Sequence, residues 1–148
     1  MNTAGATWRR LACAFSCSLA QLTSAQTLPI EKLDHYAINT VDLEKSAAWY
    51  FKVLGMTPIK KWDGVWLLGG AAGRVGIFQA PANAARSSPE KSIGFLHVAF
   101  SVPAGQLDSL KSRLTQGEIA FREEDIGIAN SVFVNDPDGN EIEFIQYK

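Results

Sequence analysis

Alternating apolar and polar positions occur in two related segments of the chain. Residues 33–39 (LDHYAIN) and 95–101 (FLHVAFS) each place a histidine on one face of a predicted strand and large apolar side chains on the other. A segment with the periodicity of an amphipathic helix follows each of them. The pattern therefore indicates an internal repeat.

The two predicted helices cover residues 42–54 and about 104–116. Asp42 is a suitable N-cap for the first helix, and Gly55 ends it, while the second helix ends near Gly117. Three predicted strands follow each helix, with Asp136-Pro137-Asp138-Gly139 as the turn before the last one. These strands are 57–62, 65–68 and 74–79 in the first half, and 119–122, 131–135 and 141–147 in the second.

Each half of the chain thus has the order β-α-β-β-β, which predicts an α+β fold. We place the two modules at about residues 31–80 and 93–148 of one domain, residues 30–148. The segment between them, residues 80–92, is rich in Ala, Ser and Pro and is predicted to be a linker.

The first 25 residues differ from the rest of the chain. They contain no Asp or Glu, and Arg9-Arg10 precede the apolar run 11–20 and a stretch that ends in Thr23-Ser24-Ala25. This order is typical of a secretory signal peptide, and it predicts export to the periplasm or the medium. An N-terminal helix packed on the domain is the alternative. Both cysteines lie in this segment, so the mature chain would have no thiolate ligand or nucleophile.

Composition narrows the possible partners. The chain has 148 residues, 47% hydrophobic residues and a formal charge of -1, which describes one globular domain with a substantial core. This balance argues against nucleic-acid binding. No apolar run reaches the ~18 residues that span a bilayer, so no membrane partner is predicted. A small molecule remains the expected partner.

The mature chain contains two histidines, and the repeat places His35 and His97 at equivalent strand positions. Pairing of the two first strands would direct both imidazoles into one cavity, whereas a lone histidine on a strand is more often a hydrogen-bonded core residue. A third ligand is expected from the last strand, where Glu143 stands between two large apolar residues. Glu141 is interpreted as a solvated residue of an edge strand. Gly76 occupies the place that corresponds to Glu143 in the first module and offers no ligand.

Two histidines and one carboxylate with open coordination positions suit one divalent metal ion per site. Fe(II) or Mn(II) is favoured by this ligand set, and Zn(II) is also compatible with it. Candidates for a general base are Glu124 and Glu123, in a region that a solvated loop would also explain. Trp62, Trp66 and Phe133 are candidates for the wall of a substrate pocket, although each would also suit an ordinary core.

The chain from about residue 32 to 147 resembles the vicinal oxygen chelate superfamily, which includes glyoxalase I, extradiol dioxygenases, fosfomycin-resistance enzymes and bleomycin-binding proteins. The resemblance rests on the two histidine strands, on residues 42–46 (DLEKS), 49–50 (WY) and 54–56 (LGM), and on residues 136–143 (DPDGNEIE). It implies paired βαβββ modules that form a U-shaped, largely antiparallel sheet around a metal-site cavity. It also implies ligands at His35, His97 and Glu143, and a homodimer whose site can draw residues from both subunits.

The chain departs from the patterns of individual family members. The fourth ligand of glyoxalase I would fall at Gly76. Extradiol dioxygenases and fosfomycin-resistance enzymes carry a tyrosine at the position of Phe133, and the latter a threonine at the position of Ala37. Phenylalanine cannot donate a proton, which argues against ring cleavage by the usual route. Export argues against a cytosolic thiol co-substrate.

The resemblance therefore implies a metal-dependent enzyme, dioxygenase-like or glyoxalase-like, that acts on a small oxygen-chelating substrate. Two other functions remain open at this point. One is a metal-free ligand-binding protein similar to the bleomycin-resistance proteins, in which both histidines are incidental. The other is an isomerase or epimerase, in which a metal stabilises an enediolate and a carboxylate moves the proton.

Overall fold

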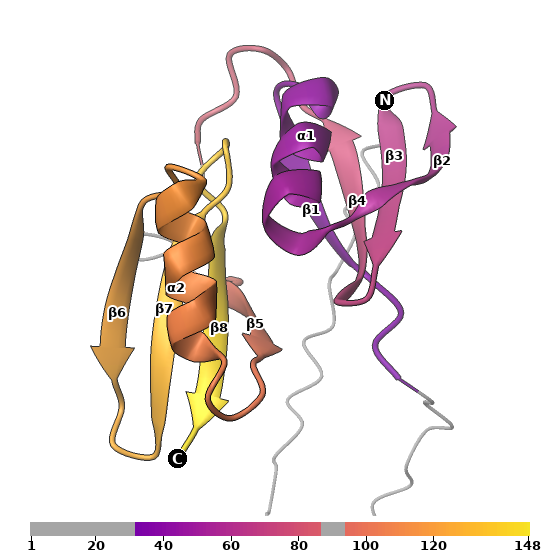
Figure 1. The fold of residues 1–148 in the computed structure, drawn as a ribbon. Helices are drawn as coiled ribbons and strands as arrows, with labels where there is room; N and C mark the ends of the chain where they lie inside the picture. The colour runs from indigo at the N-terminus through magenta and orange to yellow at the C-terminus, as the bar shows by residue number, and fades with distance from the viewer. Residues whose placement is uncertain (1–31, 87–93) are drawn as a thin grey trace, which may run out of the picture. The chain divides into compact units, whose positions relative to one another are not determined.

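The computed structural model describes residues 32–86 and 94–148, which form two βαβββ modules (Figure 1). The first contains β1 (Tyr36–Thr40), α1 (Leu43–Leu54), β2 (Thr57–Trp62), β3 (Val65–Gly70) and β4 (Gly73–Gln79). The second contains β5 (His97–Ser101), α2 (Leu107–Gln116), β6 (Phe121–Asp125), β7 (Ala129–Asn135) and β8 (Glu141–Tyr147). The predicted α+β class and the repeated module are confirmed. The predicted signal peptide lies outside the described residues.

The two modules have the same sheet topology. The strand orders are β1-β4-β3-β2 and β5-β8-β7-β6, so the first strand of each module lies at one edge and pairs with the last strand. That pairing is parallel in both sheets, and the other pairings are antiparallel. In the register, Ala37 lies opposite Gly76 and Ala99 lies opposite Glu143. Gly76 and Glu143 are therefore equivalent positions, as the sequence alignment of the two halves predicted.

Local sequence explains the helix ends. The Asp42 side chain accepts a hydrogen bond from the Lys45 backbone N–H, and Gly55 ends α1 with a left-handed φ of 66°. The second helix starts later than the sequence predicted, at Leu107, because Gly105 has a positive φ of 77° and interrupts the helical backbone. Among residues 32–86 and 94–148, no helix has the length and apolar character needed to cross a bilayer.

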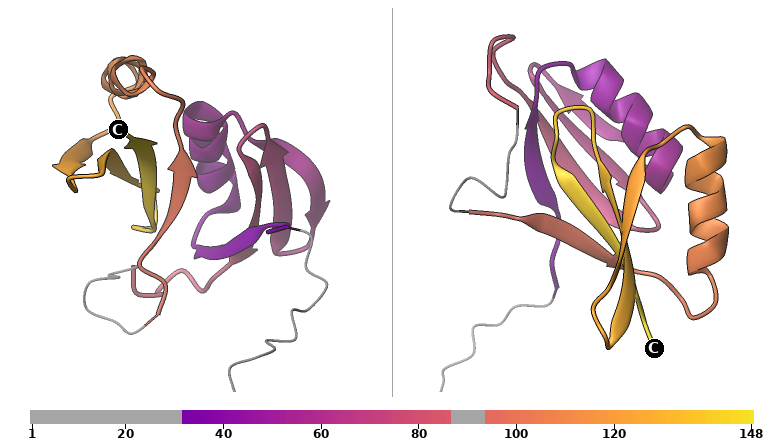
Figure 2. Two further views of the ribbon diagram at one scale, coloured as in Figure 1. Left: turned by 90° about the horizontal axis from the view of Figure 1, so that it is seen from below. Right: turned by 90° about the vertical axis from the view of Figure 1, so that its left-hand side faces the viewer.

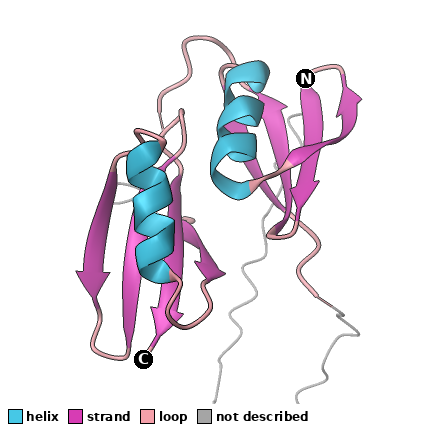
Figure 3. Ribbon diagram, viewed as in Figure 1, coloured by secondary structure: helices cyan, strands magenta, loops and turns pink. Residues whose placement is uncertain are grey.

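Each helix covers one face of its own sheet (Figures 1 and 3), which we call the helix face. The alternation along the strands directs the apolar side chains to this face, where the core lies. The largest buried side chains there include Tyr50, Met56, Leu68, Ile77, Val132, Val134 and Ile142. Two further views show the helices on these faces (Figure 2). The opposite faces carry the remaining side chains of the strands, among them His97 of β5.

The turn between β7 and β8 also contacts the first module. The Tyr50 hydroxyl of α1 donates a hydrogen bond to Asp136 at 3.1 Å, and the Ser46 hydroxyl donates one to Asp138 at 3.3 Å. Asp138 also accepts from the Val41 backbone N–H at 3.4 Å. Both aspartates are buried, so these bonds to carboxylates count for more than surface contacts would. The sequence predicted the turn but not this second role.

Candidate metal centre and pocket

The face of the second sheet opposite α2, here called the site face, carries a cluster of polar side chains from all four strands. The register places Phe133 opposite Glu143 and Arg122 opposite Phe133, and His97 is two residues before the partner of Glu143. Because side chains two residues apart in a strand share a face, all of these residues point the same way. They line a pocket of about 1030 Å³.

His97 and Glu143 are in direct contact. The distance between His97 Nε2 and Glu143 Oε2 is 3.0 Å, and the Glu143 side chain is only 8% exposed. The Ser131 hydroxyl donates a hydrogen bond to the other carboxylate oxygen at 2.6 Å. A buried carboxylate is costly unless it is paired or binds a cation, and these two partners meet that need. The imidazole nitrogen and the carboxylate oxygen are thus within hydrogen-bonding distance of each other, and both are groups of the kinds that bind divalent ions.

Phe133 and Arg122 form one wall of this pocket. The guanidinium carbon of Arg122 lies 3.6 Å from the centroid of the Phe133 ring, and this ring also contacts His97 edge to face. Partial burial lowers the pKa of Arg122, but hydrogen bonds and charge from Glu141 and Glu124 outweigh it and raise the pKa. The wall is therefore apolar at Phe133 and permanently cationic beside it.

The structure separates the two candidate bases. Glu124 lies opposite Ser131 in the register, shares the site face and lines the pocket of His97 and Glu143. It is 3.1 Å from Arg122 Nη1. Glu123 points to the helix face and pairs with Lys111 of α2 at 3.1 Å. Of the two carboxylates, only Glu124 can reach a substrate held in this pocket.

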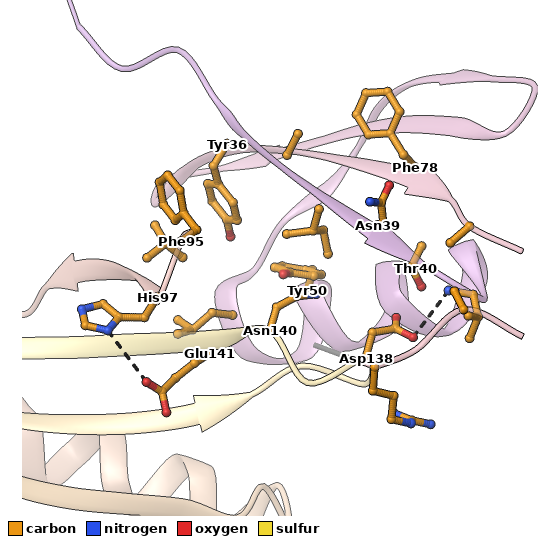
Figure 4. A pocket seen from close by; sticks show the side chains of 18 of the residues that line it. Tyr36, Asn39, Thr40, Tyr50, Phe78, Phe95, His97, Asp138, Asn140 and Glu141 are labelled. Atoms are coloured by element: carbon orange, nitrogen blue, oxygen red, sulfur yellow. Dashed lines mark hydrogen bonds and ion pairs between the residues drawn. The ribbon is translucent and has the colours of Figure 1, made fainter. Parts of the chain in front are cut away.

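Glu141 corrects an interpretation made from the sequence. It belongs to β8, which lies between β5 and β7 and is not an edge strand. Its side chain is 18% exposed and pairs with Arg122 Nη2 at 3.0 Å. Its other oxygen lies 3.8 Å from His97 Nδ1, and Figure 4 shows these two side chains facing each other. Glu141 is thus a half-buried neighbour of the candidate ligand. Alternation along β8 puts Glu141 on the same face as Glu143. Only the order of the strands shows that His97 and Arg122 lie beside Glu141.

His35 lies one residue before β1, at the place that corresponds to His97, and it is apart from the other two candidate ligands. It contacts Asp34, and its Cδ2 atom is 3.7 Å from where a Cβ of Gly76 would lie. Among residues 32–86 and 94–148, no group of three or more His, Cys, Asp or Glu side chains is arranged to hold a metal ion. His97 and Glu143 fit two positions of the predicted ligand set, and the third is not beside them in one chain.

The two tryptophans differ in position. Trp62 lies opposite Val65 on β3, on the face of the first sheet that also carries Gly76 and Phe78, and its side chain is exposed. Trp66 lies opposite Ile77 and packs against the core on the helix face. Trp62 therefore shares a face with His35, whereas Trp66 belongs to the core side of the sheet.

A second cavity of about 760 Å³ runs along β1 and β5 (Figure 4). Its lining includes both histidines, Tyr36, Tyr50 and Phe95. Burial and the nearby Asp136 carboxylate raise the pKa of Tyr50, and burial likewise raises the pKa of Tyr36. Both phenols are therefore neutral hydrogen-bonding groups in a mostly apolar cavity. The sequence did not mark either of them as a cavity residue, because a tyrosine on an apolar stripe is ordinary core.

Comparison with known proteins identifies the relatives of this chain. The family model described as the Glyoxalase/Bleomycin resistance protein/Dioxygenase superfamily matches residues 32–144. A Serratia marcescens protein, "Glutathione transferase FosA", is 25% identical over 115 residues, which cover 77% of this chain and 79% of that protein. A Bacillus subtilis "Catechol-2,3-dioxygenase" is 32% identical over 111 residues, which cover 73% of this chain but 39% of that protein.

Solved structures agree on the fold. A glyoxalase/dioxygenase from Nostoc punctiforme superposes with a TM-score of 0.67 over 84% of this chain and 98% of that chain, at 20% identity. A fosfomycin resistance protein, FosX, from Listeria monocytogenes gives 0.64 over 80% of this chain and 95% of that chain, at 18% identity. At these identities the similarity supports the architecture and leaves the chemistry to the residues of the site.

Proposed function

Because this chain belongs to the glyoxalase/bleomycin resistance protein/dioxygenase superfamily, we propose that it is a metal-dependent enzyme acting on a small substrate that binds through two oxygen atoms. The observation that carries the proposal is the 3.0 Å contact between His97 Nε2 and the buried Glu143 carboxylate on the wall of a pocket. His35, His97 and Glu143 would hold one Fe(II) or Mn(II) ion, with Zn(II) as the other candidate.

The third ligand would come from a second copy of the chain. The strands β1 and β5 are at the edges of their sheets, and an edge strand offers unpaired backbone groups to another chain. Large apolar side chains remain exposed just before each of these strands, with Leu33 77% and Phe95 85% exposed. A homodimer that pairs β1 of one subunit with β5 of its partner would cover these residues and bring His35 to the site face.

The pocket residues would divide the work as follows. The metal, when bound, would supply Lewis acidity or a place to activate oxygen. Glu124 would accept or return a proton at its carboxylate, with Arg122 holding it in position. Phe133 would exclude water and provide an apolar surface for a flat substrate. Because phenylalanine at position 133 cannot carry a proton, a carboxylate such as Glu124 would do so.

The test is metal content in anaerobically purified protein, with His35→Ala and His97→Ala variants alone and as an isolated mixed dimer. Near-stoichiometric metal is expected in the wild type and almost none in either variant. The mixed dimer should recover about half of the wild-type content, because one of its two sites has all three ligands. No recovery would place the site within one chain, and metal-free wild-type protein would contradict the proposal.

A metal-free ligand-binding protein is the second candidate. It is favoured by the mostly apolar cavity of about 760 Å³, whose neutral polar groups include Tyr36 and Tyr50. In that case His35→Ala/His97→Ala protein would bind flat apolar dyes as tightly as the wild type.

Loss of turnover without loss of metal in Glu124→Gln would instead support proton transfer by Glu124, as an isomerase or epimerase requires.

We also propose that the chain is exported. The support is the acid-free segment 1–25 with its apolar run and its terminal small residues. Intact-mass analysis of the periplasmic or secreted protein should show a mature chain that begins at Gln26. Recovery of a full-length product from that fraction would contradict this proposal.

A further inference from the structure

His35 and His97 share an arrangement that goes beyond their equivalent strand positions. In the first module, Asp34 Oδ1 lies 2.8 Å from His35 Nδ1, and Arg74 Nη1 holds the other Asp34 oxygen at 2.8 Å. The Nδ1 atom of His35 is therefore engaged by a carboxylate, and an arginine fixes that carboxylate from the neighbouring strand. The Nε2 atom of His35 is not one of the atoms that bind Asp34 or Arg74.

The second module repeats the arrangement around His97. Glu141 Oε1 lies 3.8 Å from His97 Nδ1 (Figure 4). Arg122 Nη2 lies 3.0 Å from the other carboxylate oxygen, Oε2. Nδ1 of His97 is buried and has no hydrogen-bond partner at this distance. A buried ring nitrogen without a partner is costly, and Glu141 is the carboxylate placed to accept its proton after a small side-chain movement.

The two modules reach this arrangement with different residues. Glu141 lies opposite His97 in the β5–β8 register. In the first module, Arg74 directly precedes Val75, the partner of Tyr36, so the position equivalent to Glu141 carries a cation. Asp34, next to His35 in the chain, supplies the carboxylate there. Simple duplication of one motif does not account for this, because the acidic residue comes from a different position in each half.

We propose that Asp34 and Glu141 are positioning residues that accept the Nδ1 proton of His35 and His97, and that Arg74 and Arg122 hold these carboxylates in place. Each ring then presents an unprotonated Nε2 atom, the form that a metal ion requires. This inference rests on the metal site proposed above. Stability is a weaker explanation, since exposed ion pairs such as that of Asp34 and Arg74 contribute little to folding.

The decisive variants are Asp34→Asn and Glu141→Gln. The amide oxygen of each new side chain will bind the arginine, and its NH₂ group will then face Nδ1 as a donor. A donor at Nδ1 favours the tautomer that carries its proton on Nε2. The substitutions keep shape and size, so they reverse the hydrogen-bond direction with little change in packing.

The first measurement is ¹⁵N NMR of the imidazole rings in metal-free protein, at a pH where both rings are neutral. The mature chain has two histidines, so two ring signals are expected and a His35→Gln variant assigns them. We expect His35 to carry its proton on Nδ1 in the wild type and on Nε2 in Asp34→Asn. Asp63→Asn, in the exposed turn between β2 and β3, is the matched control and should leave His35 unchanged.

His97 needs a background in which Glu143 does not compete, because Glu143 contacts its Nε2 atom. In metal-free Glu143→Ala protein, we expect His97 to carry its proton on Nδ1. Adding Glu141→Gln should move that proton to Nε2. A wild-type His35 protonated on Nε2, or a tautomer that either amide substitution leaves unchanged, would overturn the inference for that ring.

The second measurement is Zn(II) affinity, by competition with a chelating dye. Loss of the positioning carboxylate should weaken binding about 10- to 100-fold in Asp34→Asn and in Glu141→Gln. Glu123→Gln, on the opposite face of the same sheet, should bind zinc as the wild type does. Wild-type protein that binds no zinc would contradict the proposed function, while the metal-free spectra would still decide the tautomers. Unchanged affinity in both variants would overturn the role of the carboxylates toward the metal.

Discussion

The two modules share one topology but differ at the strand position that holds Gly76 in one and Glu143 in the other. The parallel pairing of first and last strands is the same in both modules. It places Gly76 beside β1 in the first sheet and Glu143 beside β5 in the second. The second module therefore joins His97 to a buried carboxylate at this position, whereas the first has no carboxylate there beside His35. This difference teaches that the scaffold supplies two equivalent places for ligands, and that the side chain at one strand position decides whether a place is used.

The largest expected effect comes from removing the residue that distinguishes the modules. Glu143→Gln keeps the shape of the side chain and the hydrogen bond with Ser131 but removes the charge. Metal retention should fall at least tenfold, or about 1.4 kcal/mol or more. Elemental analysis after dialysis against a weak chelator measures this, with Glu123→Gln as the control. Unchanged retention would show that Glu143 is not a ligand and that the modules do not differ in the way proposed.

A second difference lies in the helices, since Tyr50 of α1 donates to the buried Asp136 of the other module. Tyr50→Phe should lower the free energy of unfolding by about 1 to 2 kcal/mol, because it removes a hydrogen bond to a carboxylate. Urea unfolding at neutral pH measures this. If Tyr50→Phe has the same free energy of unfolding as the wild type, this bond contributes nothing to the contact between modules.

The same variant has a signature in alkaline solution. Burial raises the pKa of Tyr50 in the folded protein above the value of about 10 for an unfolded tyrosine. The folded state then holds the proton more tightly, so the stability that depends on it is complete below pH 10 and decreases as the pH rises further. Above pH 10, the free energy of unfolding should therefore decrease less steeply with pH in Tyr50→Phe than in the wild type, as urea unfolding at several pH values would measure.

The smallest effect is expected from making the modules alike. Gly76→Glu would place a carboxylate beside His35, but its Cβ would lie 3.1 Å from the Phe78 ring, which must move. We expect a loss of about 1 kcal/mol in stability from this crowding, together with tighter binding of Zn(II) because a fourth ligand becomes available. Gly76→Gln is the uncharged control. Equal zinc affinity in the two variants would show that Gly76 does not face the metal.

Much of the fold was predictable because its determinants are local. Asp42 caps the start of α1 with its side chain, Gly55 ends the helix with a left-handed backbone, and the bounds of β8 follow from alternation. The start of α2 was predicted too early, because Gly105 adopts a positive φ that a count of apolar positions does not reveal. The sequence also left undecided which way Glu124 points. Alternation puts Glu123 and Glu124 on opposite sides of the strand, but it does not show which of them lies on the side of the site.

The sequence by itself determined the repeated module, the equivalent positions of the two histidines and the correspondence of Gly76 to Glu143, because strand periodicity and internal repetition are visible in the order of the residues. Only the tertiary structure decided that Glu141 lies beside His97, that Arg122 holds it, and that His35 is apart from Glu143. These facts depend on strand order and on contacts between residues distant in sequence. Such contacts form only when the sheets assemble, so no pattern of neighbouring residues in the sequence predicts them.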